Sequence, residues 1–280
     1  MQAYSFITAD TLISTARSEA IGSTTSSLAA LQDTMMLAKV QQINAEFVNA
    51  AHTKHPLGGW SWMRTVTNFQ TKSHTNLNGA VAAGDASFVL TSGADWDSTG
   101  RSVIETAKGA LDFVDHSSKA THTMTVSTAT GAETLSMAHA TGERVEKLPP
   151  LPSDYSKARV LYVNSTIYDY ERLDQFPDSG HFTTYGPYIL MPRGLGAQDC
   201  TLYYEKKGNT ISGLTSETNI PSELSQYAVE KLKAYIYLVR RKRGDVQTAL
   251  ALAEDGLQYA FSMDSQQTSN SEFTRIPLPY

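Results

Sequence analysis

The chain opens with apolar residues at helical spacing. Asp10 and Thr11 stand ahead of the apolar residues Leu12, Ile13 and Ala16. Residues 6–20 are therefore predicted to form a short first helix that ends before Gly22. From Leu28 onward, apolar residues recur at steps of three or four, which predicts a long amphipathic helix. Its apolar stripe is Met36, Val40, Ile43, Phe47 and Ala51. Pro56 restricts the residue before it, so we expect the helix to end before this proline.

The period changes after Gly59. The aromatic and β-branched residues of 60–66 fit a pleated strand better than a helix. From about residue 72 to residue 147 the chain is rich in Thr, Ser, Gly and Ala, and we interpret this stretch as a small β-domain of hairpins. Its short strand-like runs are 87–91, 121–127 and 143–148. The prolines at 149, 150 and 152 mark its end, because they fit neither a helix interior nor a central strand.

A second, compact sheet is predicted beyond these prolines. Residues 158–170 are dense in Val, Leu, Ile and Tyr. Residues 188–191 and 200–204 look like further strands around the loop 192–198.

Two helices are predicted near the end of the chain. Pro221 stands at a first helical position and begins a helix with the stripe Leu224, Ala228, Leu232, Tyr235 and Val239. Gly244 supplies a left-handed end to this helix, and Asp245 can cap the next one. The second stripe is Val246, Ala249, Leu250, Ala253, Leu257, Ala260 and Phe261. We expect the two helices to form an antiparallel hairpin.

These elements predict an α+β fold. Its helical core consists of the N-terminal helices and the C-terminal antiparallel helical hairpin, together with a small sheet and an inserted β-rich domain. We expect a discontinuous core of residues 1–70 and 149–265, a β-rich insertion of residues 71–148, and an extended C-terminal tail of residues 266–280.

Composition narrows the class of protein. The chain has 280 residues, of which 41% are hydrophobic and 18% charged, as in ordinary globular proteins. Its net charge of -5 means that any contact with nucleic acid must come from a local patch, so the charge of the chain as a whole argues against non-specific DNA binding. Cys200 is the only cysteine, which excludes an intrachain disulfide framework and a cysteine-based zinc cluster and fits a reducing cytoplasm.

The sequence gives no sign of secretion or membrane insertion. The first residues lack the basic segment of a signal peptide, since no basic residue precedes Arg17. No apolar run approaches the roughly 18 residues of a membrane-spanning helix. We therefore expect a soluble protein.

Two small clusters have the composition of ligand sites. His52 and His55 are three residues apart, a spacing that lets two imidazoles share a metal, but no third ligand is nearby. A solvated helix end is the preferred interpretation. Asp95 and Asp97 flank Trp96, which is reminiscent of sugar or calcium sites. Because the regular ligand spacing of a calcium loop is absent, a turn with a packed tryptophan is preferred.

Catalytic and nucleotide-binding motifs are missing from the sequence. The glycines at 194 and 196 lack the third glycine and the helix of a dinucleotide site, so a turn is predicted. The chain has no Gly-Lys-Ser/Thr phosphate loop and no Gly-x-Ser-x-Gly elbow. We expect no enzymatic activity, no cofactor and no metal. Trp60 and Trp62 are interpreted as core residues that share one face of a strand.

The strongest charge cluster is the run Arg240, Arg241, Lys242 and Arg243. Its place in the last turn of a predicted helix offers an explanation from the helix dipole alone. Four consecutive basic residues exceed what a helix end requires, so a patch facing DNA or a partner is supported equally well.

Several short motifs occur in an order that carries a resemblance. They are Gln42-Ile43-Asn44-Ala45-Glu46-Phe47, Gly59-Trp60-Ser61-Trp62, Leu151-Pro152-Ser153-Asp154-Tyr155, Met191-Pro192, Leu202-Tyr203-Tyr204-Glu205 and Ile220-Pro221-Ser222-Glu223-Leu224. In this order they resemble the head-to-tail adaptor, or connector, subunits of tailed bacteriophages. The resemblance covers most of residues 5–265. The order of the motifs is the distinctive feature.

This resemblance implies a non-catalytic virion protein. Family members form a homo-oligomeric ring, usually twelvefold, in the virion neck between the portal protein and the tail or its nozzle. The ring is assembled in the host cytoplasm and helps to keep packaged DNA enclosed. For this chain, a non-specific contact with packaged DNA in the channel is one of the partner contacts that the resemblance suggests. Extended C-terminal segments commonly dock on the portal. The corresponding docking residues are Phe273, Arg275, Ile276, Pro277, Leu278, Pro279 and Tyr280. The smaller family members lack or shorten the insertion.

Two other functions compete with this one. The first is a carbohydrate- or receptor-binding virion module carried by the insertion, with Trp96 and nearby tyrosines as the binding platform. The second is a virion-associated hydrolase, which rests only on scattered acids and histidines.

Overall fold

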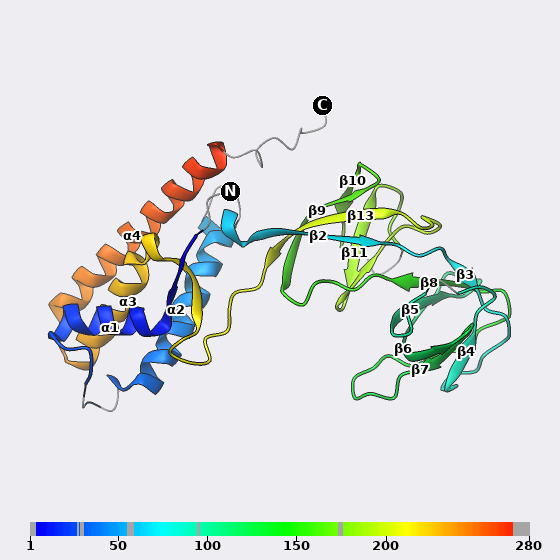
Figure 1. The fold of residues 1–280 in the computed structure, drawn as a ribbon, viewed down its shortest axis with the longest axis horizontal. Helices are drawn as coiled ribbons and strands as arrows, with labels where there is room; N and C mark the ends of the chain where they lie inside the picture. Colours follow the sequence, from blue (N-terminus) through cyan, green and yellow to red (C-terminus); the bar gives the residue numbers. More distant parts are fainter. Residues whose placement is uncertain are drawn as a thin grey trace. The chain divides into compact units, whose positions relative to one another are not determined.

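The structure is a computed structural model of the chain (Figure 1). It describes residues 4–26, 28, 31–54, 59–93, 96–172 and 176–270, without the side chains of 267–270. These residues form two compact units. The helical unit combines Met1–Arg64 with Lys206–Tyr280, and the strand-rich unit is Thr65–Glu205.

The helical unit brings together the two ends of the chain. Its described helices are α1 (Ala9–Ile21), α2 (Asp33–Lys54), α3 (Gln226–Val239) and α4 (Arg243–Asn270), with the 3-10 turns η2 (Ser61–Met63) and η3 (Ser222–Leu224). α3 and α4 form the predicted antiparallel hairpin and lie side by side in Figure 1. α4 extends through Asn270, five residues into the predicted tail segment of residues 266–280.

Strand pairing changes the start of two predicted helices. β1 (Phe6–Thr8) pairs antiparallel with β14 (Glu217–Pro221), although the two strands are far apart in sequence. The first helix therefore begins only at Ala9, where the side chain of Thr8 accepts a hydrogen bond from the Thr11 amide. Pro221 likewise ends β14 instead of beginning a helix.

Aromatic side chains form the centre of the helical unit. Trp60 is 1% exposed and stacks on Phe47, with ring centroids 4.5 Å apart. It also lies 4.7 Å from the ring of Trp62 and 5.0 Å from that of Phe261. The core role predicted for Trp60 is confirmed. Residues 61–63 form a 3-10 turn, however, so the two tryptophans do not share a face by strand alternation.

The strand-rich unit contains two six-stranded sheets. The first sheet has the order β12 (Tyr188–Leu190), β11 (His181–Tyr185), β10 (Thr166–Tyr170), β9 (Tyr155–Val163), β13 (Asp199–Lys206) and β2 (Arg64–Gln70). The second sheet has the order β3 (Thr75–Asn76), β8 (Arg144–Leu148), β5 (Gly100–Glu105), β6 (Leu111–Ala120), β7 (Thr123–Val126) and β4 (Ser87–Val89). The second sheet lies within residues 71–148.

Tight turns set the register of these sheets. Val163 pairs with Thr166, so Asn164 and Ser165 form a two-residue hairpin loop with φ values of 44° and 70°. Asparagine tolerates this left-handed conformation better than most residues. Thr121 has a φ of 55° in the connection between β6 and β7. The turn at Asn164 and Ser165 explains why residues 158–170 give two strands of a hairpin.

The predicted helical core with a small sheet is wrong. Helix and strand each account for 32% of the described residues, and sheets dominate the fold. Residues 155–206, predicted to add a small sheet to the helices, supply five strands of a sheet with a separate hydrophobic core. The buried residues of that core include Leu161, Phe182, Ile189 and Leu202. The apolar runs were recognisable locally, but their long-range pairing was not.

The helices were also compared with the requirements of a membrane span. Among the helices that the structure describes, none is both long enough and apolar enough to cross a membrane.

Candidate functional site

Residues 240–243, the basic turn, comprise the connection between α3 and α4 together with the first residue of α4. Arg241 takes the left-handed conformation, with a φ of 59°. Backbone N–H groups of the turn donate to the last carbonyl groups of α3: Arg240 to Ile236 at 3.0 Å, Arg241 to Leu238 at 3.0 Å and Lys242 to Tyr237 at 2.9 Å. The prediction that Gly244 ends α3 is wrong, because Gly244 already lies within α4.

The side chains of the basic turn are exposed to solvent. Lys242 Nζ lies 4.0 Å from Asp245 Oδ2 and 5.9 Å from the ring centroid of Tyr237. Within the described part of the chain, no hydrogen bond or ion pair engages the side chains of the three arginines. The turn therefore presents positive charge that the fold leaves almost uncompensated.

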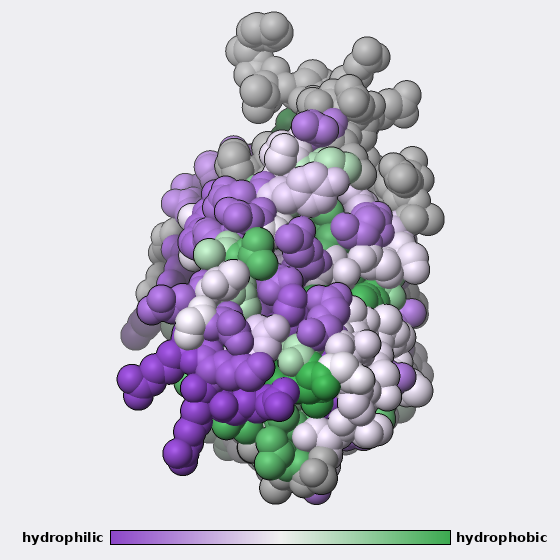
Figure 2. All heavy atoms as spheres, turned by 90° about the vertical axis from the view of Figure 1, so that its left-hand side faces the viewer, coloured by the Kyte–Doolittle hydropathy of each residue, from purple (hydrophilic) through white to green (hydrophobic). Residues whose placement is uncertain are grey.

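Exposed apolar side chains lie near the basic turn and farther along α4. Leu238, at the end of α3, is 62% exposed, and Leu250, Leu252 and Tyr259 of α4 are also exposed. Figure 2 faces the end of the helical unit that lies at the left of Figure 1, and long hydrophilic side chains project there beside hydrophobic atoms. Next to the basic turn, the exposed Leu238 therefore adds an apolar side chain to a positively charged surface.

The predicted docking tail is not part of this surface. Its residues lie outside the described part of the chain: Phe273, Arg275, Ile276, Pro277, Leu278, Pro279 and Tyr280.

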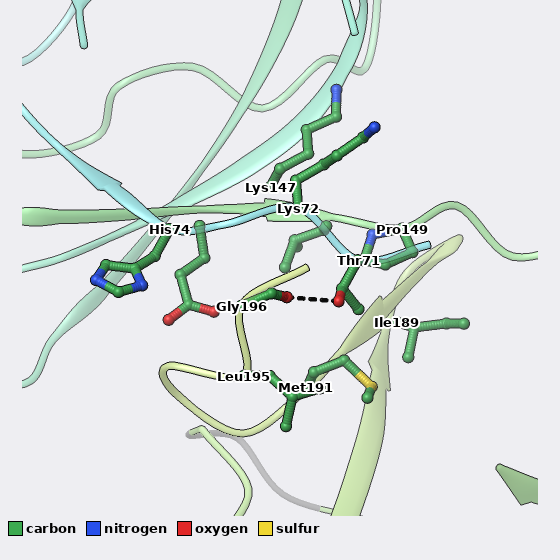
Figure 3. A pocket seen from close by; sticks show the side chains of 11 residues that line it. Thr71, Lys72, His74, Lys147, Pro149, Ile189, Met191, Leu195 and Gly196 are labelled. Atoms are coloured by element: carbon green, nitrogen blue, oxygen red, sulfur yellow. Dashed lines mark hydrogen bonds between the residues drawn. The ribbon is translucent and has the colours of Figure 1, made fainter. Parts of the chain in front are cut away.

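The strand-rich unit holds a small pocket beside β8 (Figure 3). Its volume is about 10 Å³, the size that holds a single water. Thr71 Oγ1 donates a 2.6 Å hydrogen bond to the carbonyl oxygen of Gly196 at its edge. The side-chain amines of Lys72 and Lys147 point away from this bond in Figure 3. The hydrogen bond from Thr71 holds the loop 192–198 in place. The pocket itself has no room for a substrate.

A second, shallower depression of about 280 Å³ lies beside the same loop. Arg193 contributes to its wall but also pairs with Glu105 and lies 5.3 Å from the ring centroid of Phe176. Gly194 and Gly196 have φ values of 74° and 72°. These values confirm that the glycines form a turn.

A buried polar cluster joins three strands of the second sheet. Lys147 Nζ lies 3.0 Å from His116 Nε2 and donates a 2.6 Å hydrogen bond to the carbonyl oxygen of Thr99. A Cβ atom on Gly100 would lie 2.5 Å from this nitrogen, so the lysine would have to shift for any other residue, and the φ of 131° at this position itself favours glycine. Burial lowers the pKa of Lys147 from 10.5 to about 8. Burial and the neighbouring lysine charge lower the pKa of His116 from 6.5 to about 4.

Sequence reasoning missed this cluster for a structural reason. Its residues are far apart in sequence and meet only because Gly100 pairs with His116 and Ser102 pairs with Lys147. The cluster binds the loop before β5 and offers no accessible reactive group, since His116 is 2% and Lys147 8% exposed. We assign it a role in stability.

A second buried group contains His139 and two carboxylates. The ring nitrogens of His139 lie 2.8 Å from Glu143 Oε2 and 2.9 Å from Asp112 Oδ2. Asp112 also accepts hydrogen bonds from the amide and the hydroxyl of Ser136, at 2.9 and 2.6 Å. These contacts fix the loop before β8. Among the described residues, no group of three or more His, Cys, Asp or Glu could hold a metal.

The other candidate ligand residues of the sequence analysis have structural roles or lie outside the described residues. Trp96 is 3% exposed and its indole donates to the carbonyl oxygen of Ser73 at 3.1 Å, which confirms a packed tryptophan and removes it as a binding platform. His52 lies in the last turn of α2. Asp95 and His55 lie outside the described residues.

Comparison with known proteins adds no assignment. No protein-family model matches the chain, and no curated protein matches its sequence.

Proposed function

We propose that this chain is a structural subunit of a virion neck, in which identical copies form a ring between the portal vertex of a phage head and the tail. The ring helps to retain packaged DNA, and its work is mechanical and not catalytic. The observation that carries the proposal is the set of exposed apolar side chains along the α3–α4 hairpin. The order of sequence landmarks that resembles phage adaptors supplies the identity of the ring.

The positions of these side chains favour a ring over a simple dimer. At about 100° per residue, Leu252 and Tyr259 fall together on one side of the buried stripe of α4, and Leu250 falls on the other side. A twofold dimer buries one patch against its own copy, whereas a closed ring joins two different patches of neighbouring copies. We call these two exposed edges the apolar margins of α4: Leu252 with Tyr259 on one side, and Leu250 on the other. Two such margins on one helix fit contacts with two neighbouring copies.

The composition of these margins fits contact between copies. Exposed leucine and tyrosine side chains gain free energy when neighbouring chains exclude water, at roughly 25 cal/mol per Å² of apolar surface. Tyrosine is also enriched in the buried parts of interfaces. The helical unit contains the hairpin and is therefore the proposed ring body, and the tail residues 273–280 remain the proposed contact with the portal.

The experiment removes one margin and leaves the buried face of the hairpin unchanged. In the full chain, Leu252→Ser with Tyr259→Ser is compared with the control pair Gln247→Ser and Gln258→Ser, which changes exposed polar residues of the same helix. Assembly is measured by light scattering and electron microscopy, and folding by circular dichroism. We expect the apolar pair to abolish rings in a folded chain, while the control pair assembles normally.

Two results would overturn the proposal. One is a wild-type chain that forms no ring at high concentration or with a portal protein. The other is an apolar double variant that assembles as the wild type does, because the proposed margin would then not lie in an interface.

A further inference from the structure

The position of the basic turn is unfavourable for the helix that follows it. Arg243 is the first residue of α4, a helix of 28 residues, and the N-terminus of a helix carries a partial positive charge. Acidic residues stabilise this end and basic residues destabilise it. Asp245 is the only acidic residue that the structure places in the first turn of α4. The helix dipole therefore does not explain Lys242 and Arg243.

The preceding helix does not require the basic side chains either. The last carbonyl groups of α3 already accept hydrogen bonds from backbone N–H groups of the turn, as described above. A positive charge at this end of α3 favours Arg240 through the helix dipole. The fold thus accounts for one basic residue of the four.

We propose that Arg240, Arg241, Lys242 and Arg243 form a binding site for the phosphate backbone of nucleic acid, without sequence selectivity. Guanidinium groups present paired N–H donors that match phosphate oxygens, and three of the four residues are arginines with unengaged side chains. The turn holds no Asn, Gln, Ser or Thr with which to read base edges. Arginine and lysine also read guanine edges in the major groove, so the comparison of two duplexes below tests whether the contacts are with phosphates.

The charge of the whole chain makes this site indispensable for binding. The chain has 23 basic and 28 acidic residues, for a net charge of -5, so the rest of the molecule does not attract a polyanion. An acidic surface elsewhere opposes association at a distance. Affinity must then come from short-range contacts at the basic turn.

The meaning of this site in a virion, contact with packaged DNA, rests on the proposed neck function. Binding itself is a property of the basic turn and is measured on the purified full chain in any oligomeric state. If the chain binds DNA but forms no ring, the binding site is supported and the proposed neck function is contradicted. If the chain forms a ring that does not bind DNA, the neck function is supported and the binding site is contradicted.

The test uses the salt dependence of binding to a fluorescently labelled 20-base-pair duplex. Four phosphate contacts predict that affinity falls by about 150-fold between 50 and 200 mM salt for a single chain. With Arg240→Gln, Arg241→Gln and Arg243→Gln, one contact remains and the fall is about three- to fourfold. The slope of log affinity against log salt drops to about one quarter, and this ratio holds for a single chain and for a ring.

Two controls separate the site from general charge. Lys108→Gln, Lys206→Gln and Lys207→Gln remove three exposed positive charges elsewhere and should leave the salt slope unchanged. Replacing the three arginines by lysine keeps the charge and should preserve most of the slope. Two duplexes of different sequence should bind within about twofold of each other, as expected for backbone contacts.

Three outcomes would overturn the inference. The first is an equal loss of binding in the arginine-to-glutamine variant and in the distant lysine control. The second is tighter binding of a poly-glutamate peptide than of the duplex at equal charge, which would assign the turn to an acidic protein surface. The third is tighter binding of phosphatidylserine vesicles than of the duplex, which would assign it to a lipid surface.

Discussion

At the scale of single residues, His116 links the stability of the second sheet to pH. Its folded pKa of about 4 lies below the ordinary 6.5, so the unfolded chain binds more protons between these values. The stability that a neutral His116 permits is present above pH 6.5 and is lost as pH falls toward 4. The pKa of Lys147 is also lowered by folding, from 10.5 to about 8, so its contribution to the stability of the fold rises as pH increases between these two values.

We predict that His116→Asn reduces the acid sensitivity of the second sheet. Between pH 7 and pH 4 the free energy of unfolding of the wild-type sheet should fall by about 3 kcal/mol more than that of the variant, since each unit of pKa shift corresponds to about 1.36 kcal/mol. Hydrogen exchange of the β5 and β6 amides at both pH values measures this difference. Parallel losses in the two proteins would contradict the role of the histidine.

Asn44 is the residue that connects α2 to the segment before α3. Its side-chain amide donates to the carbonyl oxygen of Asn209 at 3.1 Å and to Asn219 Oδ1 at 3.0 Å. Its own side-chain oxygen accepts from the Asn219 amide at 2.7 Å. Asn44 is 1% exposed, so these partners cannot turn to water when it is removed.

We predict that Asn44→Ala lowers the free energy of unfolding of the helical unit by about 2–4 kcal/mol, because buried polar groups lose their partners. Asn49→Ala is the matched control, since Asn49 lies on the same helix but is exposed. The control should change stability by less than about 0.5 kcal/mol. Urea denaturation followed by helical circular dichroism compares them, and similar losses in both variants would refute the assignment.

At the scale of elements, the backbones of α3 and α4 approach closely at Gly256. A Cβ atom placed there would lie 2.9 Å from the backbone nitrogen of Tyr227, which belongs to α3. The glycine therefore allows the backbones of the hairpin to touch. Gly244, in the first turn of the same helix, has open space at its Cβ position.

We predict opposite effects for alanine at these two positions. Gly256→Ala should destabilise the hairpin by about 1–3 kcal/mol, because the methyl group forces the helices apart. Gly244→Ala should stabilise it by up to about 1 kcal/mol, because alanine loses less conformational freedom in a helix. Thermal unfolding measures both changes. A stabilising Gly256→Ala would show that the close approach does not limit the packing.

Elements with local signals were the ones that sequence predicted well. The stripe of α2 and those of the α3–α4 hairpin follow helical periodicity, and the structure has helices at all three places. β1 was predicted as part of a helix because its three residues become a strand only by pairing with β14, some 210 residues later. Local periodicity carries no information about such a partner.

The candidate site was predicted only in part, for the same kind of reason. Four consecutive basic residues were visible in the sequence, but their place at the start of α4 depends on the left-handed conformation of Arg241, where glycine was expected to end the helix. The cluster around Lys147 was missed because strand register alone brings its members together. The isolated Gly100 at the start of β5 was the one local sign of a close approach.

At the scale of the whole molecule, the two units have separate hydrophobic cores. The helical unit buries Trp60, Phe47 and Leu232 in one cluster, while the strand-rich unit has its own clusters in each sheet. Sequence reasoning assigned residues 149–205 to the helical core because it could not count the strands that would join one sheet. The proposed ring body is therefore the helical unit alone.

The ring itself is tested most directly by native mass spectrometry of the full chain, alone and with a portal protein. We expect a single closed species with a mass near twelve times 30.6 kDa, which persists on dilution. A chain that remains at 30.6 kDa in both conditions, or an open series of masses without a closed end point, would contradict the proposed ring.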